Sequence, residues 1–182
     1  MLVSHEKICV MIKEALPHIY ELIEKYKPKS FGEIGSHEGL TARLLCHKIL
    51  EYHPRLTYVG YDAYEEVPKI EHNGKSTPNQ IKLVKRLNWL QRKYKHFKYE
   101  LIVGYTNRTL ITPRKFGIVY VDGGHSYETV KHDYSMIKDS KIIIFDDYNL
   151  GGVKKAVDEI GKGYQMEFDT ERGKNKKWVI IN

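Results

Sequence analysis

Ser30-Phe31-Gly32-Glu33-Ile34-Gly35-Ser36-His37-Glu38-Gly39-Leu40 joins a short apolar segment to a turn that contains two glycines. The pattern predicts a buried strand that ends at Gly35 and a helix that runs from Leu40 to Leu50. Glycine permits turn angles closed to other residues and lets a ligand lie against the backbone. The following helix directs its unpaired N–H groups at the same place. We therefore expect a ligand site at this turn, although many such glycines serve only to turn the chain.

The spacing of these residues separates two kinds of nucleotide site. A dinucleotide site has the pattern G-x-G-x-x-G, which this turn lacks. The pattern Glu33-x-Gly35-x-x-x-Gly39 resembles instead the first motif of class I S-adenosylmethionine (SAM)-dependent methyltransferases. The resemblance implies that Glu33 reaches toward the methionine ammonium, directly or through water. It also implies that Gly35 lets the cofactor approach and that Ser36 lines the same site.

Length and composition are those of an ordinary globular domain. The 182 residues are 41% hydrophobic and 29% charged, which predicts one domain over 1–182 with an N-terminal helical segment over 1–29. We expect a cytoplasmic protein without a membrane segment, since no apolar run approaches about 20 residues and the N-terminus lacks the form of a signal peptide. Cys9 and Cys46 are expected to be buried thiols. The net charge of +7 indicates solvated basic faces, a phosphate-bearing substrate or nucleic acid.

Strand and helix patterns alternate along the chain. After the strand before Gly35, apolar segments predict strands at 56–61, 99–103, 116–121 and 141–145, separated by helices. Two further strands near 164–168 and 177–181 are joined by a short polar loop, which indicates an antiparallel hairpin. The expected fold is a doubly wound, Rossmann-like α/β/α sandwich with a mostly parallel sheet that ends in this hairpin.

Acidic residues lie at or near the ends of four of the predicted parallel strands, including Glu33 in the first. Asp62 ends the second strand, where a carboxylate can bond both ribose hydroxyls of a nucleoside, and Ala63 follows it. Asp122 ends the fourth strand, and Asp146 and Asp147 end the fifth. Carboxyl ends of parallel strands meet at one edge of the sheet, where ligands of such folds bind. We therefore expect these acids to lie together with Glu33 rather than merely to end their strands.

Two later segments sharpen the resemblance. Asp122-Gly123-Gly124-His125-Ser126-Tyr127 and Asp146-Asp147-Tyr148 look like the D-G-x-H-x-Y and D-D-Y motifs of a small methyltransferase family. Its relatives include sugar and macrolide O-methyltransferases that need a divalent metal. The resemblance covers roughly residues 31 to 160 and implies SAM as cofactor, with Asp122 contributing to both the cofactor site and the catalytic site.

The acids also indicate a metal independently of the resemblance. Asp122, Asp146 and Asp147 would repel one another unless a proton or a cation intervened. Mg²⁺ or Mn²⁺, bound through oxygen ligands, relieves this repulsion and acidifies a bound hydroxyl. A hydrogen-bonded acid cluster without a metal is the alternative. His125 is the candidate general base, and it is equally compatible with a role that only holds its loop.

The surroundings of this edge are less specific. Residues 63–77 show no clear period and are expected to form a lid or substrate-recognition loop. Tyr64 and Thr106 are candidates to line an adenosine pocket, and His37 is expected beside the cofactor or in solvent. Thr77 is a candidate cap of a helix that begins at Pro78.

The sequence favours methylation of a small hydroxylated acceptor, such as a sugar or a phosphate-bearing compound. A nucleic-acid methyltransferase is an alternative that the charge favours. Amino-methylating DNA enzymes, however, usually place Asn or Asp before Pro-Pro and an aromatic residue after the fourth strand, where this chain has Asp122-Gly123-Gly124-His125. A non-catalytic nucleotide-binding protein is a further alternative. The sequence leaves the acceptor, the metal and the oligomeric state open.

Overall fold

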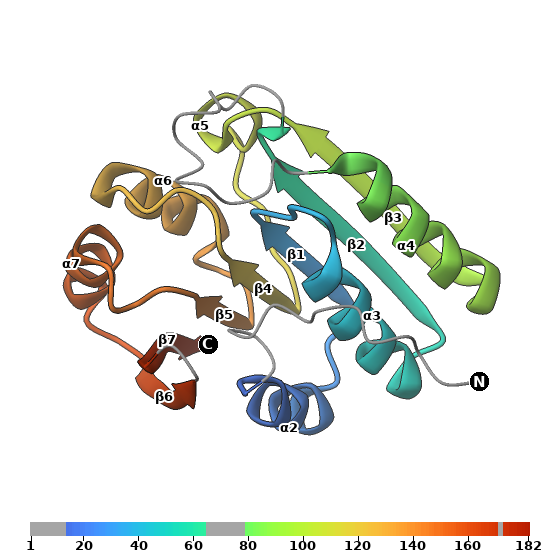
Figure 1. Cartoon of the computed structure of the whole chain (residues 1–182), viewed down its shortest axis with the longest axis horizontal. Helices are drawn as coiled ribbons and strands as arrows, with labels where there is room; N and C mark the ends of the chain where they lie inside the picture. Colours follow the sequence, from blue (N-terminus) through green and yellow to red (C-terminus); the bar gives the residue numbers. More distant parts are fainter. Residues whose placement is uncertain (1–13, 65–78, 171–172) are drawn as a thin grey trace.

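The computed structural model describes residues 14–64, 79–170 and 173–182, and its centre is a seven-stranded sheet (Figure 1). The strand order is β3-β2-β1-β4-β5-β7-β6. Strands β1 to β5 pair in parallel, whereas β7 runs antiparallel to both β5 and β6. This confirms the predicted fold class. The strands are β1 Ser30–Ile34, β2 Arg55–Asp62, β3 His96–Val103, β4 Ile118–Val121, β5 Ile142–Phe145, β6 Tyr164–Thr170 and β7 Gly173–Ile181.

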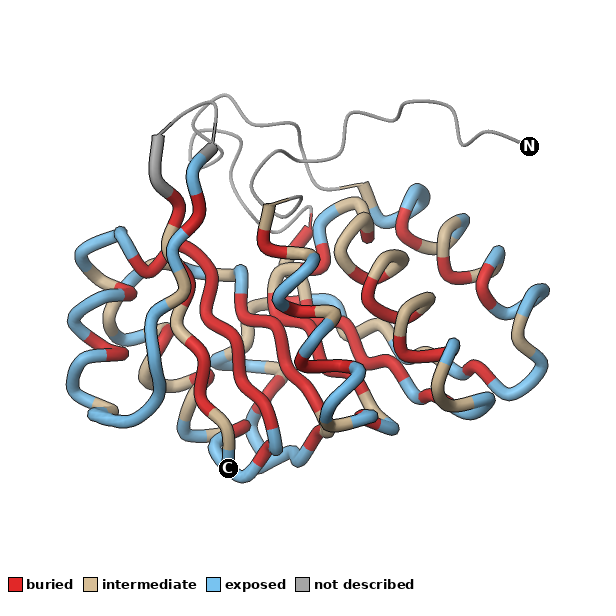
Figure 2. Tube along the Cα trace, turned by 90° about the horizontal axis from the view of Figure 1, so that it is seen from below, coloured by how far each residue is buried: buried red, intermediate tan, exposed pale blue. Residues whose placement is uncertain are grey.

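Helices cover the two faces of the sheet unequally. Helices α2 (Leu16–Tyr26), α3 (Leu40–Tyr52) and α4 (Gln80–Lys93) contribute to one core cluster. Helices α6 (Tyr127–Ile137) and α7 (Gly151–Ile160) contribute to the other, next to the single turn α5 (Thr106–Thr109). Residues of one strand alternate between the clusters, as the pleat requires. The buried strands between the two helical layers are visible in Figure 2.

The ends of the helices follow from local chemistry. Pro17 lies in the first turn of α2, where a missing N–H does no harm. The Asn79 side chain accepts a hydrogen bond from the Lys82 N–H and caps α4, and the Ser126 hydroxyl caps α6 in the same way through Thr129. The predicted cap Thr77 lies outside the described residues, as does most of the predicted lid over 63–77. The helix predicted after Ser4 and the thiol of Cys9 lie outside them as well.

Strand β1 lies at the centre of the parallel sheet, between β2 and β4. Ile34 is level with Tyr61 on one side and with Val121 on the other. The chain order reverses direction here, since β2 and β3 follow on one side of β1 and β4 and β5 on the other. The crevice outside the carboxyl ends of strands at such a point is where open α/β sheets bind ligands. The fold therefore places the turn at 35–39 at the ligand edge.

Asp133 of α6 is an acid buried in the layer of helices formed by α6 and α7, which is called the back layer below. It has no exposed surface, and among the described residues neither carboxylate oxygen has a hydrogen bond of good geometry, although the Thr106 side chain lies close enough to interact with it. Burial raises the pKa of Asp133 from 3.8 to about 6, against smaller opposing effects of the Thr106 side chain and His132. Because the folded pKa lies above the unfolded one, ionisation of Asp133 reduces the free energy of unfolding as the pH rises from about 4 to 6.

Asp133→Asn is therefore expected to stabilise the protein only at higher pH. At pH 4 the variant and the wild type should unfold with similar free energies, because both side chains are neutral in the fold. At pH 7 the variant should be more stable by at most about 3 kcal/mol, the free energy that corresponds to the difference between the folded and unfolded pKa values. Urea unfolding at several pH values measures the difference. A difference that does not change with pH would contradict the assignment.

Candidate active site

The loops that follow β1 and β4 pack directly against each other at the ligand edge. Gly35 has φ +89°, and a Cβ built on it would collide with the backbone carbonyl of Asp122. Gly39, at φ +75°, would likewise collide with Leu83 of α4. The two glycines of the motif are therefore required by packing within the protein itself. The sequence interpretation assigned Gly35 to the approach of a cofactor, whereas its Cβ direction faces the Asp122 loop.

Backbone strain gathers at the same edge. His37, Tyr64 and Asp147 have φ values of 45°, 45° and 51°, in the left-handed region that non-glycine residues rarely adopt. They lie in the loops after β1, β2 and β5, respectively. Such conformations persist only where the surroundings hold them, and they cluster at functional sites. The strain supports the sequence-based placement of the site.

Glu33 of β1 is buried beneath this edge, with 1% of its surface exposed. Its carboxylate accepts a hydrogen bond of 2.5 Å from the Tyr58 hydroxyl. Burial raises the pKa of Glu33 well above its usual value; the Tyr58 bond opposes this, and the negative charges of Asp122 and Asp62 add to it. A cation bound near these three acids would relieve the repulsion, so the site suits a positively charged ligand.

Asp62 links the loops after β1 and β2. Its Oδ2 accepts from the His37 N–H at 2.6 Å, and its Oδ1 accepts from the Tyr64 N–H at 2.8 Å. A carboxylate has about four acceptor positions, so each oxygen retains one for a ligand hydroxyl. The Gly104 N–H donates to the Asp62 carbonyl at 2.9 Å and holds the loop after β3 beside them. Asp62 is thus both a clamp on the loops and a candidate ribose ligand.

The remaining predicted cofactor residues are distributed around Asp62. Ser36 is buried, with its hydroxyl 3.4 Å from the Tyr61 carbonyl, and Ala63 is half-buried beside Tyr64. The Tyr64 hydroxyl is buried without a hydrogen-bond partner among the described residues, which leaves a donor for a ligand or water. Thr106 begins α5, and its carbonyl lies 3.1 Å from His132 Nε2. Thr106 is therefore tied to α6, and no described contact joins it to Asp62.

Asp122, His125 and Asp147 form a cluster at the ends of β4 and β5. One ligand atom from each lies within 4.8 Å of the others. The Nε2 of His125 lies 3.2 Å from Asp147 Oδ2, and this nitrogen is buried and has no hydrogen bond of good geometry to any described residue. Gly152 of α7 packs against the His125 carbonyl, where a Cβ would not fit, and so helps to hold the loop. Two carboxylates and an imidazole are a suitable ligand set for a divalent metal.

Asp146 is not part of that cluster. Its carboxylate forms an ion pair with Lys177 of β7, and both side chains are almost wholly buried. Asp146 also accepts a 2.5 Å bond from the Tyr120 hydroxyl and a 2.8 Å bond from the Asp147 N–H. The sequence grouped Asp146 with Asp122 and Asp147 as metal ligands; the structure brings the latter two together and adds His125 instead. The acceptors of Asp146 are directed at protein donors beneath the site.

The comparisons with known proteins identify the family. Residues 33–148, more than half of the chain, match a family model described as a methyltransferase domain. The chain belongs to this methyltransferase family, as its motifs predict, and it is an enzyme of the SAM-dependent class. No curated protein sequence matches it.

Solved structures show the same fold at low identity. TomG from Streptomyces achromogenes, an O-methyltransferase involved in tomaymycin synthesis and solved with SAM, is 15% identical (TM-score 0.62; 91% of this chain, 78% of that one). An O-methyltransferase from Bacillus cereus, solved with S-adenosylhomocysteine (SAH), is 10% identical (TM-score 0.58; 91% and 79%). The calicheamicin methyltransferase CalS11 is 14% identical (TM-score 0.65; 94% and 80%). Among the described residues, no helix is both long and apolar enough to cross a membrane.

Proposed function

We propose that this protein transfers the methyl group of SAM to a hydroxyl of a small molecule, such as a sugar, with the help of a divalent metal. The observation that carries the proposal is the cluster of Asp122, His125 and Asp147 at the ligand edge of a methyltransferase sheet. Neighbours in fold include a TDP-rhamnose 3'-O-methyltransferase, which supports a small hydroxylated acceptor.

The acids of β1 and β2 suit the charges and hydroxyls of SAM. Glu33 and Asp62 lie near Asp122, and their mutual repulsion is offset by a ligand that carries an ammonium and a sulfonium. Asp62 retains acceptor positions for the two ribose hydroxyls. The Tyr64 hydroxyl close by has no hydrogen bond of good geometry among the described residues and can donate to the cofactor. In this assignment Glu33 faces the methionine end of the cofactor and Asp62 faces the ribose.

The cluster of Asp122, His125 and Asp147 suits Mg²⁺ or Mn²⁺. The Nε2 of His125 is buried 3.2 Å from Asp147 Oδ2 and has no hydrogen bond of good geometry among the described residues, so its lone pair can ligate a metal. When bound there, the ion supplies Lewis-acid chemistry that acidifies an acceptor hydroxyl. The protein's own part is to hold two carboxylates and an imidazole on the loops after β4 and β5, next to the cofactor residues.

His125 has a second role available in the same position. With a metal on Nε2, the imidazole is a ligand and does not accept the acceptor's proton. Without a metal, Nε2 would donate to Asp147, 3.2 Å away, and Nδ1 would be the nitrogen that accepts a proton, as in a general base oriented by an acid. We assign the ligand role because the Asp122 carboxylate converges on the same point, where a cation offsets both acids.

Transfer of labelled methyl groups from SAM to a panel of sugars and other hydroxylated small molecules tests the function. Transfer should fall to background after chelation and return on addition of Mg²⁺ or Mn²⁺. Transfer that persists after exhaustive chelation would leave His125 as the base and remove the metal from the account. Transfer to DNA or RNA alone would favour the nucleic-acid alternative. Retention of SAM without turnover on any acceptor would favour a non-catalytic nucleotide-binding protein.

Asp62→Ala is expected to weaken the binding of SAH about 5- to 150-fold. The ribose hydroxyls lose the Asp62 carboxylate as their acceptor, at a cost of about 1–3 kcal/mol. The backbone N–H groups of His37 and Tyr64 lose the same acceptor. Calorimetric titration measures the change, with Asp139→Ala at an exposed position as the control. Equal affinity of wild type and Asp62→Ala for SAH would show that Asp62 does not contact the ribose.

A further inference from the structure

The back face of β2 and β3 carries a basic groove at the end of the sheet opposite the active site. The groove has a volume of about 360 Å³ and is lined by Lys29, Arg55, Leu56, Thr57, His96 and Lys98. In register, Arg55 is level with His96, and Thr57 is level with Lys98. Because side chains alternate along a strand, these four share one face, while Phe97 is buried on the other. Two adjacent strands thus present donors in two consecutive rows.

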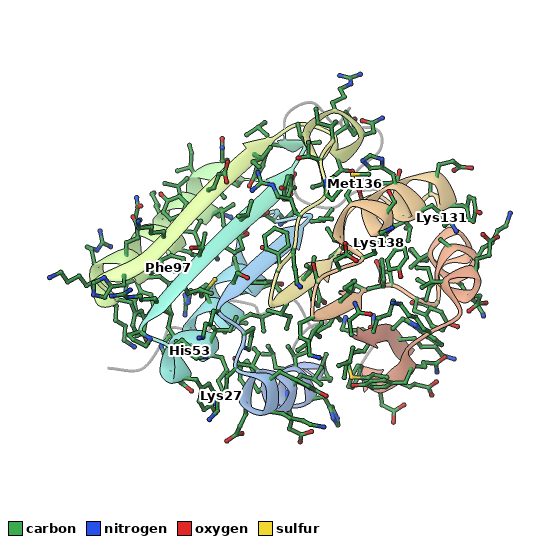
Figure 3. The ribbon with its side chains drawn as sticks, turned by 180° about the vertical axis from the view of Figure 1, so that it is seen from behind. Lys27, His53, Phe97, Lys131, Met136 and Lys138 are labelled. Atoms are coloured by element: carbon green, nitrogen blue, oxygen red, sulfur yellow. The ribbon has the colours of Figure 1, made fainter. Side chains whose placement is uncertain are left out.

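The groove exists because the back layer of helices is incomplete here. The connection from β3 to β4 contains only the single turn α5, which lies near the carboxyl end of β2. Seen from behind, the first halves of β2 and β3 run without a helix over them (Figure 3). Arg55, Thr57, His96 and Lys98 are all exposed. This sheet face is therefore open to a ligand.

The cations in the groove have no acidic partner among the described residues. Lys29, Arg55 and Lys98 make no salt bridge with any residue of the described ranges, and the nearest acid along the same face of β3 is the exposed Glu100. Most other lysines near acids are paired, as Lys48, Lys82 and Lys154 are. Three cations around one groove repel one another until an anion binds.

We infer that this groove binds a small molecule carrying two or more phosphate groups. Arginine and lysine are the usual phosphate ligands, and the Thr57 hydroxyl and the His96 ring add further donors. No Phe, Tyr or Trp of the described residues lines the groove, because Tyr58, Phe97 and Tyr99 belong to the opposite face. A platform on which nucleic-acid bases stack is therefore missing from it. The chemistry fits a phosphate chain and not a polynucleotide.

The groove is separate from the methyl-transfer site. Strand β2 runs from Arg55 in the groove to Asp62 at the active site. Seven residue steps of about 3.3 Å place the two roughly 23 Å apart. The inference is thus independent of the proposed function, and SAH binding serves as the check that a variant is folded.

Calorimetric titration with inorganic tripolyphosphate at 150 mM salt tests the inference. Wild type should bind it, and Arg55→Glu/Lys98→Glu should bind it at least tenfold more weakly while binding SAH normally. The matched control, Lys85→Glu/Arg92→Glu, makes the same charge change at exposed positions of α4 and should bind tripolyphosphate like wild type.

Three results would overturn the assignment. Wild type that does not bind tripolyphosphate has no such site. Equal weakening in both variants shows general attraction to a basic protein. Binding of single-stranded oligothymidylate that depends on Arg55 and Lys98, without binding of tripolyphosphate, assigns the groove to nucleic acid instead.

Discussion

Asp147→Asn should lose both metal binding and methyl transfer, the latter by about 10³-fold or more. The ion's stabilisation of developing charge is worth several kcal/mol, and each 1.4 kcal/mol is tenfold in rate. Asparagine keeps the size of the side chain and tolerates the left-handed backbone at φ 51°. The substitution therefore removes a charge from the cluster with little disturbance of the loop.

Measuring SAH binding and unfolding separately from metal binding distinguishes loss of the metal from loss of the fold. Asp147→Asn should still bind SAH, because Glu33 and Asp62 are unchanged, and its free energy of unfolding should be equal to or above that of wild type, since acids that repel become fewer. Asp139→Asn makes the same change at an exposed site and should behave as wild type. Wild-type transfer rates in Asp147→Asn would remove Asp147 from the mechanism.

Lys177→Met should destabilise the fold by about 3–5 kcal/mol. Lys177 has no exposed surface, and its ammonium pairs with Asp146 and lies 5.5 Å from the centre of the Tyr120 ring. Removing one partner of a buried ion pair leaves the other charge buried without compensation, which accounts for the size of the effect. Urea unfolding of the variant at neutral pH measures it.

A double variant distinguishes loss of the Lys177–Asp146 ion pair from loss of side-chain packing as the cause of the destabilisation. Lys177→Met/Asp146→Asn carries no buried charge here and should recover most of the lost stability. Lys176→Met, the neighbouring position, removes a half-exposed pair with Glu167 and should change the stability by no more than about 1 kcal/mol. If the double variant is as unstable as Lys177→Met, the ion pair is not the cause.

The fold and the edge of the site followed from the sequence because both depend on local patterns. Apolar strands, four of which carry an acid at or near their carboxyl end, predict a parallel sheet with its acids at one edge. The structure confirms this for Glu33, Asp62, Asp122 and Asp147. The single turn α5 escaped prediction because four residues are too few to show a helical period.

The role of Asp146 required the structure. Lys177 stands in a run of basic residues that has the appearance of a solvated segment. Its place beside Asp146 depends on the register of β7 against β5, in which Trp178 is level with Phe145. A shift of one residue would turn Lys177 to the other face. A single sequence does not contain that register. The ion pair of Asp146 with Lys177, and the replacement of Asp146 by His125 in the cluster with Asp122 and Asp147, could therefore not be predicted from it.

The most direct test is pulsed electron paramagnetic resonance of the protein with Mn²⁺, comparing wild type with His125→Ala. The account predicts one bound Mn²⁺ per wild-type chain, with a nitrogen coupling from the imidazole of His125. His125→Ala should lose that coupling and bind Mn²⁺ about 10-fold or more weakly, as expected when one of three protein ligands is removed. Wild type that binds no Mn²⁺, or that binds it without nitrogen coupling and equally well after His125→Ala, would contradict the metal site of Asp122, His125 and Asp147.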